Sequence, residues 1–216
     1  MATAVKPRLR GVVHEYAFFV ALVAGAALLV AAPSGKARLA VGLYVLGLAG
    51  LLGTSALYHR VTWRRPNARR WMRRLDHSMI FVLIAGTYTP IALLVLSQPL
   101  ASVVLVVIWS GAVGGIVLSL LWPEAPRPVS AAIYISLGWV AIIAMPQLFH
   151  RLGALGIALI AAGGLLYSVG AIVYARQRPA PVPTVFGYHE IFHVLVVAAA
   201  ALHFAVIAFL VVPLAG

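Results

Sequence analysis

Long apolar runs alternate with short polar stretches along the chain. An apolar helix needs about 20 residues to cross a hydrocarbon core of roughly 30 Å, and seven runs of about this length can be drawn. They cover approximately residues 16–32, 39–58, 76–97, 100–121, 129–149, 152–175 and 188–213. Because backbone groups in lipid must bond within their own helices or barrels, the pattern predicts an all-α protein. We expect seven transmembrane helices that form a single membrane domain over residues 1–216.

Charge is scarce and unevenly placed. Only 9% of the residues are charged, against about 25% in soluble proteins, which excludes an ordinary soluble globule. The 16 Lys and Arg outnumber the 4 acidic residues, but they lie between the apolar runs rather than on one soluble face, so nucleic acid is not an expected partner. Lys and Arg are enriched in cytoplasmic loops. Only Lys36, Arg38 and Arg151 fall on one side of the seven spans, so the N-terminus is predicted to be cytoplasmic.

Ionisable residues interrupt the apolar runs at one depth. His59 ends the second span, Asp76 begins the third, and His189 and His193 begin the seventh. Under the predicted topology all four lie in the cytoplasmic leaflet. Ionisable groups at membrane depth are costly and usually functional. The chain has no cysteine, so any metal here would be bound by His, Asp or Glu.

The histidine spacing indicates a metal site. His189 and His193 are four residues apart, so both rings project from one face of a helix. His59 would supply a third nitrogen from another helix, and Ser55 lies one turn deeper on the same face as His59. Three His ligands with an open fourth position are typical of catalytic Zn²⁺, although Fe, Ni or Cu also accept nitrogen ligands. Each histidine taken alone is better explained as an interfacial or hydrogen-bonded residue.

The same residues resemble those of the hemolysin III family, the bacterial branch of the progestin and adiponectin receptor (PAQR) group. The matching motifs are Ser55-x-x-x-His59, the run LDHSMIFVLIAGTYTP at residues 75–90, and His189-x-x-x-His193. The resemblance implies a Zn²⁺ bound by His59, His189 and His193, with Ser55 and Asp76 beside it. It also implies a cytoplasmic N-terminus and a multi-pass protein of the bacterial inner (plasma) membrane.

The wider superfamily includes ceramidases, so a zinc-dependent lipid hydrolase is one hypothesis. Activated water would attack the carbonyl of a membrane lipid amide or ester. Asp76 would transfer the proton to the leaving group, and Ser55 would donate a hydrogen bond to the developing oxyanion. The alternative is a structural zinc that ties helices together in a non-catalytic sensor or receptor.

Two further alternatives stay open. The family name suggests pore formation, but no span carries a polar stripe suited to line a pore. The segment from His189 to His193 also fits the H-E-x-x-H pattern of zinc proteases, in which Glu190 would be the general base. We expect neither to be the main function.

Other polar residues have simpler interpretations. His14 and Glu15 belong to the same cytoplasmic layer but receive no role. His203 is expected to hydrogen-bond a neighbouring helix, and residues 87–90 (TYTP) are expected to form a kink whose freed carbonyls are satisfied locally.

Overall fold

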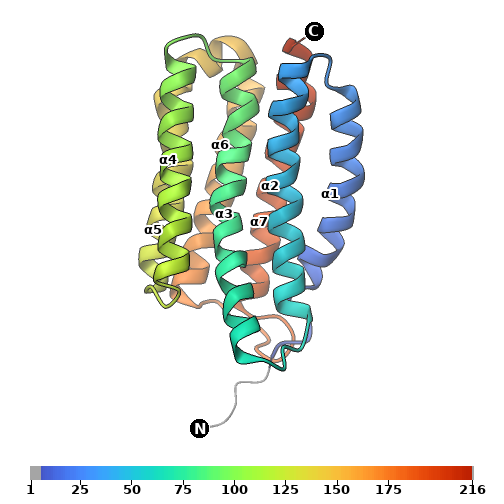
Figure 1. The fold of residues 1–216 in the computed structure, drawn as a ribbon, viewed down its shortest axis with the longest axis vertical. Coiled ribbons are helices and arrows are strands. Elements are labelled where there is room, and N and C mark those ends of the chain that lie inside the picture. Colours follow the sequence, from blue (N-terminus) through green and yellow to red (C-terminus); the bar gives the residue numbers. More distant parts are fainter. Residues whose placement is uncertain (1–5, 216) are drawn as a thin grey trace.

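Every regular element that the structure describes is helical. The computed structural model describes residues 6–215, and in that range the one pairing of strand type is an isolated bridge between Val182 and Phe186. The elements, in chain order, are α1 (Val12–Ala31), α2 (Gly35–Arg60), α3 (Pro66–Leu94), α4 (Leu100–Leu121), α5 (Arg127–Gly138), the 3₁₀ helix η1 (Trp139–Ala144), α6 (Met145–Arg176), α7 (Tyr188–Val206), the π-helical turn η2 (Ile207–Val211) and the 3₁₀ turn η3 (Val212–Ala215). Figure 1 shows the long helices side by side, with α1 starting at the lower end and α7 running to the upper end. The all-α prediction is confirmed.

Local sequence explains where several helices begin. Ser34 caps α2, because its hydroxyl accepts a hydrogen bond from the Ala37 N–H at 3.2 Å. Helix α3 begins at Pro66, a residue suited to the first helical turn. The predicted third span began at residue 76, whereas the helix that contains it begins at Pro66, because the basic residues before the apolar run continue the same helix. Asp76 therefore lies inside α3 rather than at its start.

The segment Arg127–Arg176 differs from the prediction of two separate spans at residues 129–149 and 152–175. Helices α5, η1 and α6 follow one another without an intervening loop over 50 residues. Within the described residues, six helical stretches are long and apolar enough to cross a membrane, and this segment is one of them. Gly153 breaks the helical backbone with φ 67° and ψ −176°. Figure 1 shows the segment rising from the lower end, turning at the upper end and returning.

Tyr88 of α3 supports the irregular part of that segment. Its hydroxyl donates to the Gly138 carbonyl at 2.6 Å and accepts from the Ala141 N–H at 2.7 Å. These bonds satisfy backbone groups where α5 gives way to η1. In the same stretch of α3, the hydroxyls of Thr87 and Thr89 donate to the carbonyls of Leu83 and Ala85. The carbonyl that Pro90 leaves without its usual partner is that of Gly86, so the expected local satisfaction at a kink stays a prediction.

Helix α3 stands between two apolar cores. On one side, its Phe81 shares a core with Ile108 of α4 and Leu148 of α6. On the other, its Leu83 shares a core with Tyr44 of α2, and the same core extends to α1 and α7. Large apolar side chains also cover the outer face of the bundle; they include Phe19, Val106 and Phe209. An apolar exterior on long helices identifies the chain as a multi-pass membrane protein.

Candidate metal centre

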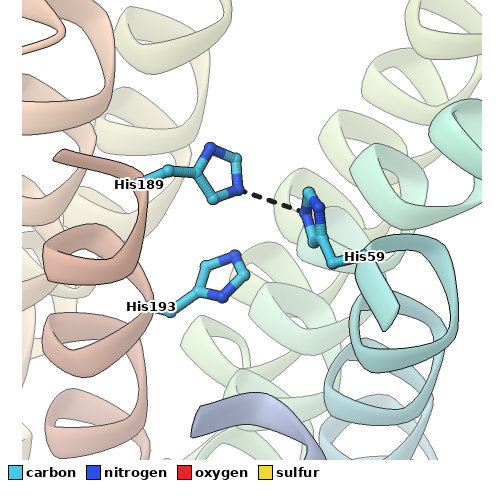
Figure 2. Close-up of side chains that lie close together, drawn as sticks. All are labelled: His59, His189 and His193. Carbon is cyan, nitrogen blue, oxygen red and sulfur yellow. Dashed lines mark hydrogen bonds between the residues drawn. The ribbon is translucent and has the colours of Figure 1, made fainter. Parts of the chain in front are cut away.

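Three histidines from two helices converge at the lower end of the bundle. His59 comes from the last turn of α2, and His189 and His193 come from the first turns of α7 (Figure 2). The Nε2 atoms of His59 and His189 are 3.1 Å apart. One ring nitrogen of each of the three residues lies within 4.8 Å of the others. His59 and His193 are buried, and His189 is partly buried. This group could hold a metal ion.

Glu190 fixes the start of α7, the helix that carries two of the three histidines. Its Oε2 atom accepts a hydrogen bond from the Gly187 N–H at 2.8 Å, and its Oε1 accepts one from Arg10 Nε at 2.5 Å. The carboxylate is 1% exposed. It thus caps the positive end of the helix while forming a buried ion pair with the N-terminal segment. Both carboxylate oxygens are engaged in these contacts.

The N-terminal segment, residues 8–10, packs against the loop that precedes α7. The N–H groups of Arg8 and Leu9 donate to the carbonyls of Thr184 and Val185, at 3.0 and 3.2 Å. The same segment therefore contacts the loop that leads into α7 and, through Arg10, the helix itself. Arg10 is one of the Lys and Arg residues that the sequence analysis used, without naming it, only to predict topology. No local motif connects it to Glu190, because 180 residues separate them.

Gly11 allows this segment to pass close to α2. Its φ of 82° lies in the left-handed region, which side chains disfavour. A Cβ atom on Gly11 would lie only 2.7 Å from the Cβ of His59. A glycine is therefore required here both by backbone conformation and by space.

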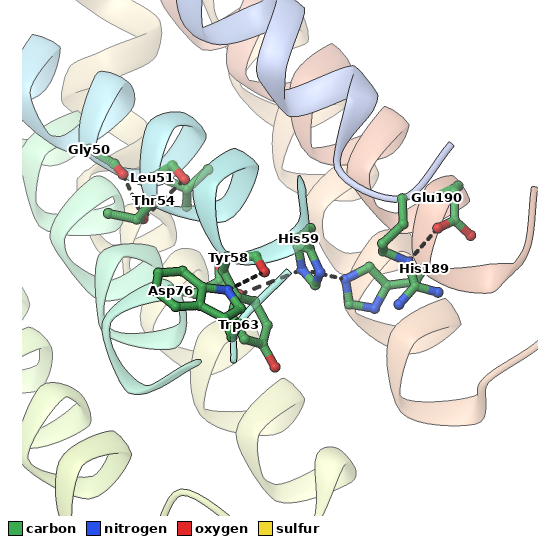
Figure 3. A network of polar contacts seen from close by, with 10 residues as sticks. Gly50, Leu51, Thr54, Tyr58, His59, Trp63, Asp76, His189 and Glu190 are labelled. Atoms are coloured by element: carbon green, nitrogen blue, oxygen red, sulfur yellow. Dashed lines mark hydrogen bonds and ion pairs between the residues drawn. The ribbon is translucent and has the colours of Figure 1, made fainter. Parts of the chain in front are cut away.

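Asp76 and Ser55 lie beside the histidines. Asp76 Oδ2 is 3.8 Å from His59 Nε2, and Figure 3 includes both side chains. Ser55, one turn before His59 in α2, is 3% exposed. Both side chains line a cavity of about 130 Å³ that also reaches His189 and His193. The structure therefore brings together all five residues that the sequence analysis selected.

The same cavity extends away from the histidines into the middle of the bundle. Its far lining includes Tyr88, Trp139 and His203, and most of the remaining lining is apolar. His203 is not part of the histidine group: its Nε2 lies 3.2 Å from the Ile160 carbonyl oxygen, which confirms the expected bond to a neighbouring helix.

His14 of α1 covers one side of the group. Its ring stacks on that of His193 with centroids 3.8 Å apart and planes 10° apart. The residue is 2% exposed. Sequence analysis placed His14 in the correct layer but assigned it no role. Glu15, the next residue, instead pairs with Arg60 at 2.6 Å.

The end of α2 is held by local bonds that position His59. Thr54 Oγ1 donates to the Gly50 carbonyl at 2.7 Å, and Trp63 Nε1 donates to the Tyr58 carbonyl at 3.1 Å. Figure 3 shows these contacts on the side of His59 opposite His189. The indole thus folds back over the helix terminus and satisfies one of its unpaired carbonyls.

The fold and the site together define a class: an all-helical, multi-pass membrane protein with a buried group of three histidines. The family profile described as Haemolysin-III related matches residues 2–204. Hemolysin-3 of Bacillus cereus is 36% identical over 188 residues, which cover 86% of this chain and 82% of the relative. The chain belongs to the haemolysin-III-related family.

Animal proteins are also similar to this chain. The human monocyte to macrophage differentiation factor is 27% identical over 170 residues, which cover 77% of this chain and 68% of the relative. The adiponectin receptor protein of Drosophila melanogaster is 29% identical over 185 residues, which cover 77% of this chain and 41% of the relative. The predicted resemblance to hemolysin III and PAQR-type proteins is therefore confirmed.

Proposed function

We propose that this protein spans the bacterial inner (plasma) membrane seven times with a cytoplasmic N-terminus. The 50-residue segment Arg127–Arg176 would be about 75 Å long as a straight helix, well over one membrane thickness. The break at Gly153 and the reversal of direction support two crossings. The one-sided distribution of Lys and Arg supports the orientation.

We further propose that His59, His189 and His193 bind Zn²⁺. The observation that carries this is the convergence of three buried or partly buried imidazoles whose nitrogens lie within 4.8 Å. Three neutral nitrogen donors with room for a fourth ligand suit zinc. The stacked ring of His14 would restrict the orientation of the His193 ring.

The reaction that this arrangement supports best is hydrolysis of a membrane lipid amide or ester. When bound, zinc would polarise the carbonyl group and activate a water molecule. Asp76 would take a proton from that water and deliver it to the leaving amine or alcohol. Ser55 would donate a hydrogen bond to the carbonyl oxygen as negative charge develops there. The products would be a carboxylic acid and the released amine or alcohol, and the apolar cavity would accommodate the acyl chain.

Metal analysis of the purified protein tests the zinc site. We expect about one zinc per chain in the wild type and none above background in a variant with all three histidines changed to Ala. Equal zinc content in the two proteins would show that the site is misassigned. Release of fatty acid from a long-chain ceramide and from a monoacylglycerol, followed by mass spectrometry, then tests hydrolysis.

A non-catalytic receptor or sensor with a structural zinc is the second candidate, because the histidines connect α2 with α7. Asp76→Asn separates the two. The hydrolase would lose turnover and keep its zinc, whereas a structural site would show no turnover in either protein. A pore-forming role would appear as dye leakage from liposomes that survives loss of all three histidines.

An intramembrane metalloprotease is disfavoured by the contacts of Glu190. A general base must reach the water molecule that it activates, and both oxygens of this carboxylate are engaged by Arg10 and Gly187. Glu190→Gln should therefore leave zinc binding intact. A protease would lose its peptide-hydrolysing activity in that variant.

A further inference from the structure

A second cavity opens beside the histidine group, at the lower end of the bundle. Its volume is about 230 Å³, and its lining includes Arg10, Arg73 and Arg127. It also shares Asp76 and His189 with the deeper apolar cavity. We call it the basic mouth. The two cavities therefore adjoin at these shared residues.

Two of the three arginines have no acidic partner. Arg10 is paired with Glu190. Among residues 6–215, no carboxylate lies within ion-pairing distance of Arg73 or Arg127. Asp76 is the one carboxylate among its lining residues, and it lies beside His59 rather than either of these arginines, so basic side chains outnumber acidic ones in the basic mouth. Such an arrangement attracts anions.

Arg127 is held in place rather than free in solvent. Its guanidinium lies over the rings of Tyr174 and Tyr188, at 5.5 and 5.9 Å from the centroids. These cation–π contacts restrict the side chain. Its Nη1 atom is buried and has no hydrogen-bond partner within the described structure. A buried, unsatisfied donor on a charged group is unfavourable, and a guanidinium offers parallel N–H groups that match phosphate oxygens.

We infer that Arg73 and Arg127 bind a phosphate group in the basic mouth. Neither guanidinium has an acidic partner within residues 6–215, so both can donate hydrogen bonds to phosphate oxygens. The phosphate would belong to a single-chain lipid whose acyl part enters the deep cavity, or would be a free phosphate ion. The placement of the acyl chain rests on the proposed lipid hydrolase function, whereas the phosphate site rests only on the basic mouth.

Binding to the protein as purified in maltoside detergent tests this inference. The probes are lysophosphatidic acid, the monoacylglycerol with the same chain, and glycerol 3-phosphate. We expect the phosphate-bearing lipid to bind at least tenfold more tightly than the monoacylglycerol, and this preference to weaken as salt is added. Equal affinities of the two lipids would overturn the inference. If glycerol 3-phosphate binds as tightly as the lipid, the basic mouth is a site for free phosphate.

The double variant Arg73→Gln/Arg127→Gln should lose the tenfold preference. Its matched control is Arg69→Gln/Arg178→Gln, which removes the same charge from two exposed residues outside the cavity and should keep the preference. If both double variants lose it equally, the effect comes from general charge and the inference fails. Arg127→Lys keeps the charge without the planar fork, and an undiminished preference in that variant would exclude the proposed bidentate contact.

Zinc content is measured in the same samples, which separates this inference from the proposed function. A phosphate preference in a protein without zinc would leave the phosphate site standing and remove the zinc hydrolase. Bound zinc without a phosphate preference would leave the zinc site standing and remove the phosphate site.

Discussion

The two ends of the helical bundle use polar residues differently. At the upper end, polar contacts are exposed or lie near helix ends: Ser34 caps α2, and Gln147 Oε1 accepts from the Ser97 N–H at 3.0 Å. At the lower end, the polar contacts around the histidines join segments far apart in the chain. His59 meets His189 across 130 residues. The upper contacts complete the helices, whereas the lower contacts assemble a group that packing alone would not require.

Loss of one histidine should have the largest effect on the lower end. His189→Ala should lower zinc affinity more than about 100-fold, since changes in residues that merely support a metal ligand already cost 10–100-fold. Competition with a chelator measures the affinity. His203→Ala is the control on the same helix, because His203 bonds to the Ile160 carbonyl instead. An equal loss in both variants would contradict the assigned group.

A destabilising substitution at the upper end should leave metal binding unchanged. Leu148 is 1% exposed in the apolar core shared by α3, α4 and α6. Leu148→Ala should lower the free energy of unfolding by about 2–5 kcal/mol through the cavity it leaves, with zinc affinity unchanged. Thermal unfolding in detergent and zinc titration give the two quantities. A parallel fall in both would show that the two ends are energetically coupled.

Gly11 precedes α1 at the lower end and Gly35 begins α2 at the upper end. The same substitution can therefore be compared at the two ends. Gly11→Ala should destabilise the protein by about 1–2 kcal/mol because of its positive φ. It should also weaken zinc binding, because the new methyl group meets His59. A Cβ on Gly35 would contact nothing within 4 Å, so Gly35→Ala should leave both properties intact. Similar results for the two variants would mean that the N-terminal segment does not position His59.

The smallest expected effect is at the cap of α2. Ser34→Ala should lower the free energy of unfolding by about 1 kcal/mol and leave zinc affinity unchanged, whereas Ser34→Asp should retain the cap. Thermal unfolding of the wild type and the two variants measures the change in the free energy of unfolding. A change in zinc affinity for Ser34→Ala would contradict the separation of the two ends.

Sequence reasoning predicted the parts that depend on period and polarity. Helix spacing put His189 and His193 on one face, and the alternation of spans put His59 in the same layer. Helix α3 begins before the predicted span, because hydropathy marks where a chain becomes apolar, not where its helix begins. The direct passage from α5 through η1 into α6 was not predicted, because the backbone groups at that junction are satisfied by the hydroxyl of Tyr88 from another helix.

Contacts of the N-terminal segment could not be predicted. The pairing of Arg10 with Glu190 brings together a loop and a helix start that share no motif. The stacking of His14 on His193 depends on the angle between α1 and α7. Both are products of the tertiary fold, so a single sequence contains no local signal for them.

The contact between residues 8–10 and residues 184–190 also sets an order of events during biosynthesis. A ribosome makes Arg10 long before Glu190, which is 180 residues further along. The N-terminal segment therefore has no partner for this contact until the rest of the chain has been made. The group of three histidines is complete only when α7 has entered the membrane. The proposed zinc would therefore be bound late, only in a chain whose last helix has reached its place.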